Sequence, residues 1–170
     1  STRPRFASSI KTSCMLRACR RAKASGRPAA VVKELVENAL DAGATRAITQ
    51  FFFSAETFFR FRDKCVAAGI DAPIIPGLLP VQSWAGTKRF AATCNTTVPD
   101  WAEEAFQLAA LDGPDAQRAL ATDLSVDLCE KLIAGGVDQL HFYTLNRPEL
   151  TRDVCAALGV RPKAGLEAVA

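Results

Sequence analysis

The stretch Ala47-Ile48-Thr49-Gln50-Phe51-Phe52-Phe53 is a short run of β-branched and aromatic residues. Such a run predicts a buried strand. Ser54 follows directly and can cap a helix that carries Glu56 in its first turn and stops at Gly69. A buried strand followed by an amphipathic helix is therefore the first structural unit that we expect.

Two further units of the same kind follow along the chain. Residues 74–81 predict a second buried strand, with its prolines near the ends or at a bulge. Residues 140–146 predict a third strand, and Pro148 opens a helix that runs to Leu158. Between these two strands, helical patterns occupy residues 82–94, 99–110 and 114–134.

One more helical pattern precedes the first strand. It spans residues 28–43, where Pro28 suits a helix start and Gly43 suits its end. Alternating buried strands and amphipathic helices favour a parallel sheet with helices outside it. Three strands are few, because a TIM barrel needs eight and typically about 250 residues.

Composition is that of one globular domain, at 170 residues, 49% hydrophobic and 23% charged. No apolar run approaches the roughly 18 residues of a membrane span. Eight of the 21 Lys and Arg lie in residues 1–27, which contain no acid, so the rest of the chain carries a net charge of −5. We expect a disordered basic tail at 1–27, a targeting peptide or gene-boundary artefact being the alternatives. The acidic body argues against nucleic-acid binding.

The cysteines have no metal-binding or redox spacing. None forms a C-x-x-C pair and no zinc template fits, so we assign no metal site. Reduced, mostly buried thiols in a cytoplasmic protein are the expectation. The six are Cys14, Cys19, Cys65, Cys94, Cys129 and Cys155.

Five strings of sequence carry a more specific signal. They are ITQFFFSAETFFRFRD at 48–63, AAGIDAPIIPGLLPV at 67–81, KRFAATC at 88–94, VPDWAEEAF at 98–106 and HFYTLNRPEL at 141–150. In this order and spacing, residues 44–162 resemble the C-terminal half of the methylenetetrahydrofolate reductase family. The resemblance implies an α/β fold that is a partial (β/α)8 TIM barrel, made of the last three strand–helix units. Its active site would lie at the C-terminal ends of the strands.

The resemblance also implies roles for individual residues. Gln50 would hydrogen-bond the folate pterin, and Phe90 would stack on folate or on the nicotinamide. Arg147 would contact substrate, because a folate glutamate tail suits a guanidinium. Further residues with implied roles are Tyr143 and Leu145, which would line the same substrate site, and Ile48, a weak candidate for cofactor contact. His141, the only histidine, is expected to be structural rather than catalytic.

The implied activity is FAD-dependent reduction of 5,10-methylenetetrahydrofolate to 5-methyltetrahydrofolate with NAD(P)H, in one-carbon and methionine metabolism. The early strands that supply the glutamate general acid and most flavin contacts have no counterpart here, so no catalytic residue is assigned. We therefore expect an incomplete enzyme that needs a complementing N-terminal half or assembles as a homo-oligomer. The alternative is a catalytically inactive half-barrel that oligomerises.

A second, shorter resemblance covers the region before the first strand. RPAAVVKELVENALDAGATR at 27–46 resembles the first motif of the MutL mismatch-repair ATPases. Glu34 would match their general base and Asn38 their magnesium ligand, on one helical face. The hexapeptide DAGATR at 41–46 fits both families. We therefore divide the body, 28–170, into a MutL-like helix at 28–43 and a reductase-like part at 44–162, and a nucleotide-binding module remains an alternative.

Overall fold

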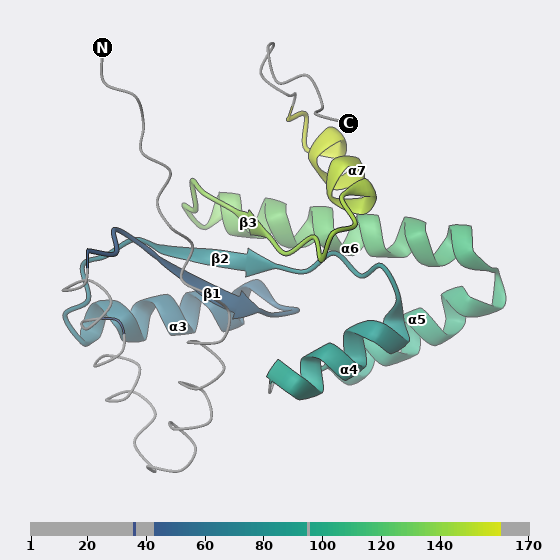
Figure 1. Cartoon of the computed structure of the whole chain (residues 1–170), viewed down its shortest axis with the longest axis horizontal. Helices are drawn as coiled ribbons and strands as arrows, with labels where there is room; N and C mark the ends of the chain where they lie inside the picture. The colour runs from purple at the N-terminus through teal and green to yellow at the C-terminus, as the bar shows by residue number, and fades with distance from the viewer. Residues whose placement is uncertain (1–35, 37–42, 95, 161–170) are drawn as a thin grey trace.

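The computed structural model describes residues 36, 43–94 and 96–160 (Figure 1). The predicted tail at 1–27 and nearly all of the predicted helix at 28–43 lie outside the described residues. The elements are β1 (Ala47–Phe51), α3 (Ala55–Ala67), β2 (Ile74–Leu78), α4 (Trp84–Cys94), α5 (Asp100–Leu111), α6 (Pro114–Ala134), β3 (His141–Phe142) and α7 (Glu149–Ala157). Each predicted strand and helix between 47 and 158 is present, so the α/β class is confirmed.

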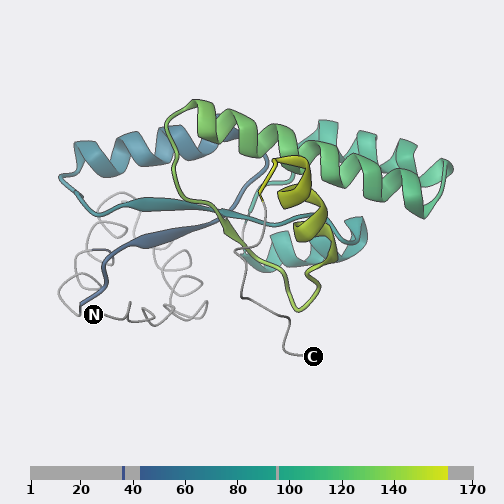
Figure 2. The same cartoon turned by 90° about the horizontal axis from the view of Figure 1, so that it is seen from above.

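The three strands form one parallel sheet in the order β1-β2-β3, so each strand pairs with the next along the chain. Helices α3 and α6 lie on the same face of this sheet (Figure 2). Helices α4 and α5 lie beyond the C-terminal ends of β1 and β2, and α7 packs against α6 (Figure 1). Because the three parallel strands follow chain order and the helices α3 and α6 lie on one face, the C-terminal ends of all three strands lie along one edge of the sheet.

The main core lies between the sheet and the helices α3 and α6. Phe58 of α3 and Leu132 of α6 are 2% and 0% exposed, and both pack with Leu78 of β2. A second cluster lies between α4, α5 and α6, where the Trp84 and Phe106 rings stack with centroids 4.5 Å apart. These two clusters fix the strand ends relative to the helices that follow them.

The start of α3 differs from the prediction in one detail. Ser54 occupies the N-cap position, but its hydroxyl donates to the Glu56 carboxylate and makes no hydrogen bond with the helix backbone. This contact lowers the pKa of the exposed Glu56 carboxyl. The predicted stop at Gly69 is confirmed, with φ +78°, a conformation that glycine adopts at little cost.

The third strand is much shorter than the predicted 140–146, because β3 ends at Phe142. The backbone turns at Leu145 and Asn146, whose φ angles are +48° and +63°, and the Arg147 N–H donates to the Thr144 carbonyl at 2.9 Å. Two consecutive left-handed residues cannot continue a strand. The LNR segment is therefore a turn at the C-terminal edge of the sheet.

Three of the predicted thiols, Cys65, Cys94 and Cys129, are buried as expected, and Cys155 is half-buried. Within the described part of the chain, no group of three His, Cys, Asp or Glu side chains could hold a metal ion. None of the described helices is long and apolar enough to cross a membrane.

Candidate functional site

The C-terminal edge of the sheet is joined across all three strands by Tyr143, the residue that follows β3. Its hydroxyl donates to the Thr49 carbonyl of β1 at 2.9 Å, and its N–H donates to the Leu78 carbonyl of β2 at 2.8 Å. The Tyr143 ring crosses β2 at Gly77, where an added Cβ would lie 2.6 Å from its Cε2 atom. Burial, and in second place the nearby Cys94, raise the pKa of the Tyr143 hydroxyl.

Strand β1 carries a bulge at this edge. Ile48 pairs with Ile75 and Phe51 pairs with Gly77. Two residues of β1 therefore lie between these pairs where β2 has one, and the extra residue forms the bulge. Side chains satisfy the backbone groups that the bulge displaces from the ladder. The Gly77 N–H donates to the buried Thr49 hydroxyl at 3.0 Å, while the Thr49 carbonyl accepts the Tyr143 hydroxyl. Bulges of this kind often re-aim side chains next to active sites.

Gln50 lies within the bulge and is half-buried. Its side-chain oxygen accepts the Phe51 N–H at 3.1 Å. Its amide nitrogen has no hydrogen-bond partner among the residues that the structure describes. A carboxamide carries two donors and two lone pairs, so Gln50 keeps two donors and one acceptor for a ligand. That set is sufficient for a bidentate contact with a planar heterocycle.

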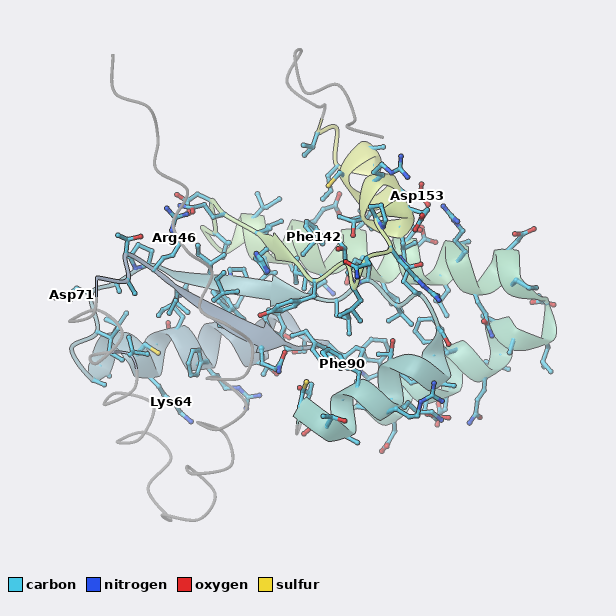
Figure 3. All side chains as sticks on the ribbon, viewed as in Figure 1. Arg46, Lys64, Asp71, Phe90, Phe142 and Asp153 are labelled. Atoms are coloured by element: carbon cyan, nitrogen blue, oxygen red, sulfur yellow. The ribbon has the colours of Figure 1, made fainter. Side chains whose placement is uncertain are left out.

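An aromatic pair lies beside this bulge. The Phe90 ring of α4 stacks on the Phe51 ring of β1, with centroids 5.5 Å apart and an interplanar angle of 9°. Phe90 lies near the C-terminal end of β1, whereas Arg46 lies at the opposite end of the sheet (Figure 3). Phe90 and Tyr143 both pack against one apolar cluster built on Phe51 and Ala91. Phe90 is half-buried, so part of its ring remains accessible.

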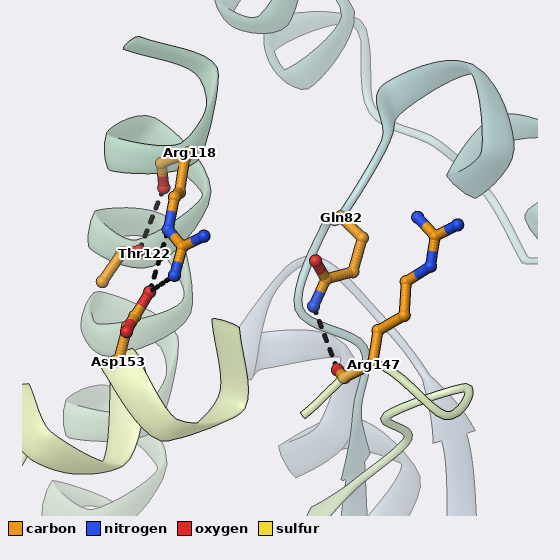
Figure 4. Close-up of polar contacts among 5 residues, drawn as sticks. All are labelled: Gln82, Arg118, Thr122, Arg147 and Asp153. Atoms are coloured by element: carbon orange, nitrogen blue, oxygen red, sulfur yellow. Dashed lines mark hydrogen bonds and ion pairs between the residues drawn. The ribbon is translucent and has the colours of Figure 1, made fainter. Parts of the chain in front are cut away.

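The turn after β3 places the Arg147 cation at the same edge. The Gln82 amide nitrogen donates to the Arg147 carbonyl at 3.1 Å and thereby ties the turn to the segment that follows β2. The exposed Arg147 side chain extends away from this bond (Figure 4), and its guanidinium makes no hydrogen bond or ion pair with a described residue. On the next helix, Asp153 holds α7 to α6 by accepting two hydrogen bonds from Arg118, at 3.0 and 2.5 Å.

Comparison with known proteins identifies the family of this chain. A family model described as methylenetetrahydrofolate reductase matches residues 23–159. The 5,10-methylenetetrahydrofolate reductase of Pectobacterium carotovorum is 45% identical over 128 residues, which are 75% of this chain and 42% of that protein. Those of Escherichia coli and Salmonella typhimurium are each 46% identical, over 72% of this chain and 41% of each relative.

This chain belongs to the methylenetetrahydrofolate reductase family. It spans about two-fifths of the length of the curated relatives that it matches. The family match begins at residue 23, upstream of Ala44, and so includes the segment that resembles MutL. Glu34 and Asn38, the two residues of the MutL-like alternative, lie outside the described residues, and nucleotide binding there stays a prediction.

The reductase fold brings the predicted substrate residues to one edge. Gln50 lies in the bulge, Phe90 and Tyr143 share an apolar cluster, and Leu145 and Arg147 lie in the turn after β3. Leu145 is 57% exposed, which is high for an apolar side chain.

Ile48, the weak cofactor candidate, lies further back in β1. It is half-buried and pairs with Ile75 of β2, below the bulge. His141 of β3 pairs with Gly77, and its ring meets the Tyr143 ring edge-on with centroids 4.9 Å apart. Burial lowers the pKa of His141, so the imidazole is uncharged at neutral pH. The aromatic packing of His141 accords with the structural role expected for it.

Sequence reasoning missed three residues that organise this edge. Thr49 uses both its hydroxyl and its carbonyl to join the strands, Gly77 leaves room for the Tyr143 ring, and Gln82 anchors the Arg147 turn. A glycine inside an otherwise branched strand often marks a close approach, so Gly77 had a detectable signal. Thr49 and Gln82 had none, because their roles depend on which backbone groups the bulge and the turn displace.

A cavity of about 40 Å³ lies on the other side of the strand ends, between the sheet and the helices α5 and α6. Phe52, Leu78, Phe106 and Leu124 are among its apolar walls, and none of the predicted site residues lines it. That volume holds only a few waters. The cavity is therefore a packing gap between the two core clusters and is too small for a folate.

Proposed function

We propose that this chain forms the last three strand–helix units of a reductase (β/α)8 barrel and carries its folate-binding wall. The support is the joint position of Gln50, Phe90 and Arg147 at the C-terminal edge of a parallel sheet. Ligands of barrel enzymes bind at this edge. A strand order that follows the chain, with α3 and α6 on one face, is the arrangement of a barrel segment.

The chemistry of the three side chains matches the parts of a folate. Gln50 offers two donors and one acceptor to the edge of a pterin. Phe90 offers a half-buried ring for stacking on its plane, with Tyr143 in the same apolar cluster. The guanidinium of Arg147, which pairs with no described residue, offers a bidentate partner for a glutamate carboxylate.

FAD and NAD(P)H belong to the complete site, and the described residues do not fit a flavin by themselves. Apart from Phe90, which the resemblance places on folate or on the nicotinamide, Ile48 is the one described residue that it assigns to cofactor contact. An aliphatic side chain offers only van der Waals contact. Strand β1 also contains no basic residue that could pair with the FAD phosphates. We therefore assign no catalytic step to this chain alone.

Completion of the site requires further strands. A second copy of this chain, or a separate chain carrying the earlier strand–helix units, could pair with the strand edges at β1 or β3. Sedimentation of the purified chain decides between self-association and a separate partner. A chain that stays monomeric at high concentration contradicts pairing between copies.

The test of folate binding is calorimetry of the purified chain with 5-methyltetrahydrofolate. We expect binding that weakens about tenfold in Gln50→Ala, because two hydrogen bonds are worth roughly 1–3 kcal/mol together. Gln117→Ala, on α6, is the matched control and should bind like the unmodified chain. Binding that is unaffected by Gln50→Ala contradicts the role of Gln50, and no binding at all supports the inactive half-barrel.

A further inference from the structure

The β1 bulge is held by side-chain hydrogen bonds, not by the regular strand ladder. The Gly77 N–H, the Thr49 carbonyl and the Phe51 N–H are each satisfied by a side chain, at 3.0, 2.9 and 3.1 Å. The side chains belong to Thr49, Tyr143 and Gln50 in that order. Buried backbone groups must be paired somewhere, so these bonds account for the displaced positions one by one.

One of these three bonds comes from outside β1 and β2. The Tyr143 hydroxyl reaches over Gly77, which has no side chain to obstruct it, and donates a hydrogen bond to the Thr49 carbonyl. A hydroxyl has a single proton to donate, and here it is committed to the protein. Tyr143 therefore has no proton left for a hydrogen bond to a ligand while this contact persists.

We propose that Tyr143 is a positioning residue, which acts on the ligand through Gln50 by holding the β1 bulge. This inference rests on the proposed function of Gln50 in folate binding. Without the hydroxyl, the carbonyl of the buried Thr49 loses its hydrogen-bond partner, and a regular β1–β2 ladder without the bulge becomes the competing arrangement. Removing a bulge shifts the register by one residue, and such a shift turns side chains to the other face of a sheet.

The consequence for Gln50 follows from its place in the bulge. The Phe51 N–H that fixes the Gln50 carboxamide is itself a bulge group, so it keeps that bond only while the bulge persists. Loss of the bulge releases the carboxamide from its fixed orientation. A ligand must then order a mobile side chain on binding, which weakens its affinity.

Tyr143→Phe removes the hydroxyl and keeps the ring, which makes it the decisive variant. We expect 5-methyltetrahydrofolate to bind about fivefold to tenfold more weakly to Tyr143→Phe, as for loss of one hydrogen bond. In a Gln50→Ala background the same substitution should change affinity by less than about twofold, because the two residues act as one unit. Thr144→Val, which removes a neighbouring hydroxyl with no side-chain hydrogen bond to described residues, should bind normally.

Amide hydrogen exchange followed by NMR supplies a measurement that needs no ligand. In Tyr143→Phe the amides of Phe51 and Gly77 should exchange at least tenfold faster than in the unmodified chain, while those in α6 should not change. The inference is overturned if the amides of Phe51 and Gly77 exchange equally fast in Tyr143→Phe and in the unmodified chain. It is also overturned if Tyr143→Phe weakens folate binding equally in the unmodified and the Gln50→Ala backgrounds. If the unmodified chain binds no folate, the proposed function fails and the ligand part of this inference fails with it.

Discussion

Replacing Gly77 by alanine tests the packing of the strand edge directly. A Cβ at this position would overlap the Thr49 carbonyl oxygen and would lie 2.6 Å from Cε2 of Tyr143. The nearest atom belongs to the backbone, and the Tyr143 ring is held by its own hydrogen bond to Thr49, so neither can move aside freely. The added methyl group therefore forces the strands apart or displaces the ring.

The magnitude follows from three contributions. Overpacking a tight site costs about 1–3 kcal/mol, and losing the Tyr143–Thr49 hydrogen bond adds about 0.5–1.5 kcal/mol. Alanine restricts the unfolded chain more than glycine does, which offsets about 0.5–1 kcal/mol. From the middle of these ranges, we expect Gly77→Ala to lower the free energy of unfolding by about 2 kcal/mol. With a urea dependence of about 2 kcal/mol/M, the midpoint should fall by roughly 0.5–1.5 M.

Urea unfolding followed by circular dichroism measures this change. The matched control is Gly86→Ala in α4, because the nearest atoms to a Cβ there belong to the Ser83 side chain at 3.6 Å. Alanine is the better helix former by about 0.5–1 kcal/mol, so this control should unfold at the same or a higher urea concentration. A Gly77→Ala midpoint equal to that of the unmodified chain would refute the close approach of Tyr143, Gly77 and Thr49.

Three further predictions concern the core and its buried groups. Phe106→Ala should lower the free energy of unfolding by about 3–5 kcal/mol, because the Phe106 side chain is 2% exposed. Leu108→Ala on the same helix should change it little in the same urea assay, because Leu108 is 65% exposed. Burial lowers the pKa of His141 in the folded chain, so below the ordinary value of 6.5 the imidazole takes up a proton more readily in the unfolded chain. The free energy of unfolding should therefore fall as pH drops through that value. Urea unfolding between pH 7 and 5.5 should show a smaller fall in His141→Phe. Burial raises the pKa of the Cys129 thiol to about 12, so iodoacetamide at pH 8 should modify the half-buried Cys155 faster than Cys129. Peptide mass mapping measures this order, and alkylation of Cys129 before Cys155 would contradict the prediction.

The sequence predicts most of the fold because its local patterns and its tertiary packing agree. The first strand is apolar and β-branched, and its helix carries Phe58 and Cys65 on one face, both of which the structure buries. The third strand is the exception. Residues 140–146 contain enough apolar and β-branched side chains for a strand, but Leu145 and Asn146 adopt left-handed backbone angles. Leucine has no local preference for such angles, so only the surrounding structure reveals the turn.

The candidate site is predictable in its location more than in its detail. Parallel strands collect their C-terminal ends at one edge, so Gln50 and Arg147 are expected together once the strands are recognised. The hydrogen bonds that orient them are not predictable in the same way. The Tyr143 hydroxyl binds Thr49, and the Gln82 side chain binds the Arg147 carbonyl, across 94 and 65 residues of sequence. Such pairs depend on the bulge and the turn, which have no simple sequence signature here.

The protonation states at the strand edge indicate which assay can reveal what this chain contributes. His141 is uncharged at neutral pH because burial lowers its pKa, so it holds no extra proton to give. Burial raises the pKa of Tyr143, and its one proton is already donated to Thr49. Neither of these two groups is therefore suited to general acid catalysis at neutral pH. Under the proposed function, Gln50 and Arg147 instead contribute to binding, through orientation and charge complementarity. A turnover assay on this chain alone would mainly report on groups that other strands must supply, whereas ligand affinity reports on Gln50 and Arg147 themselves.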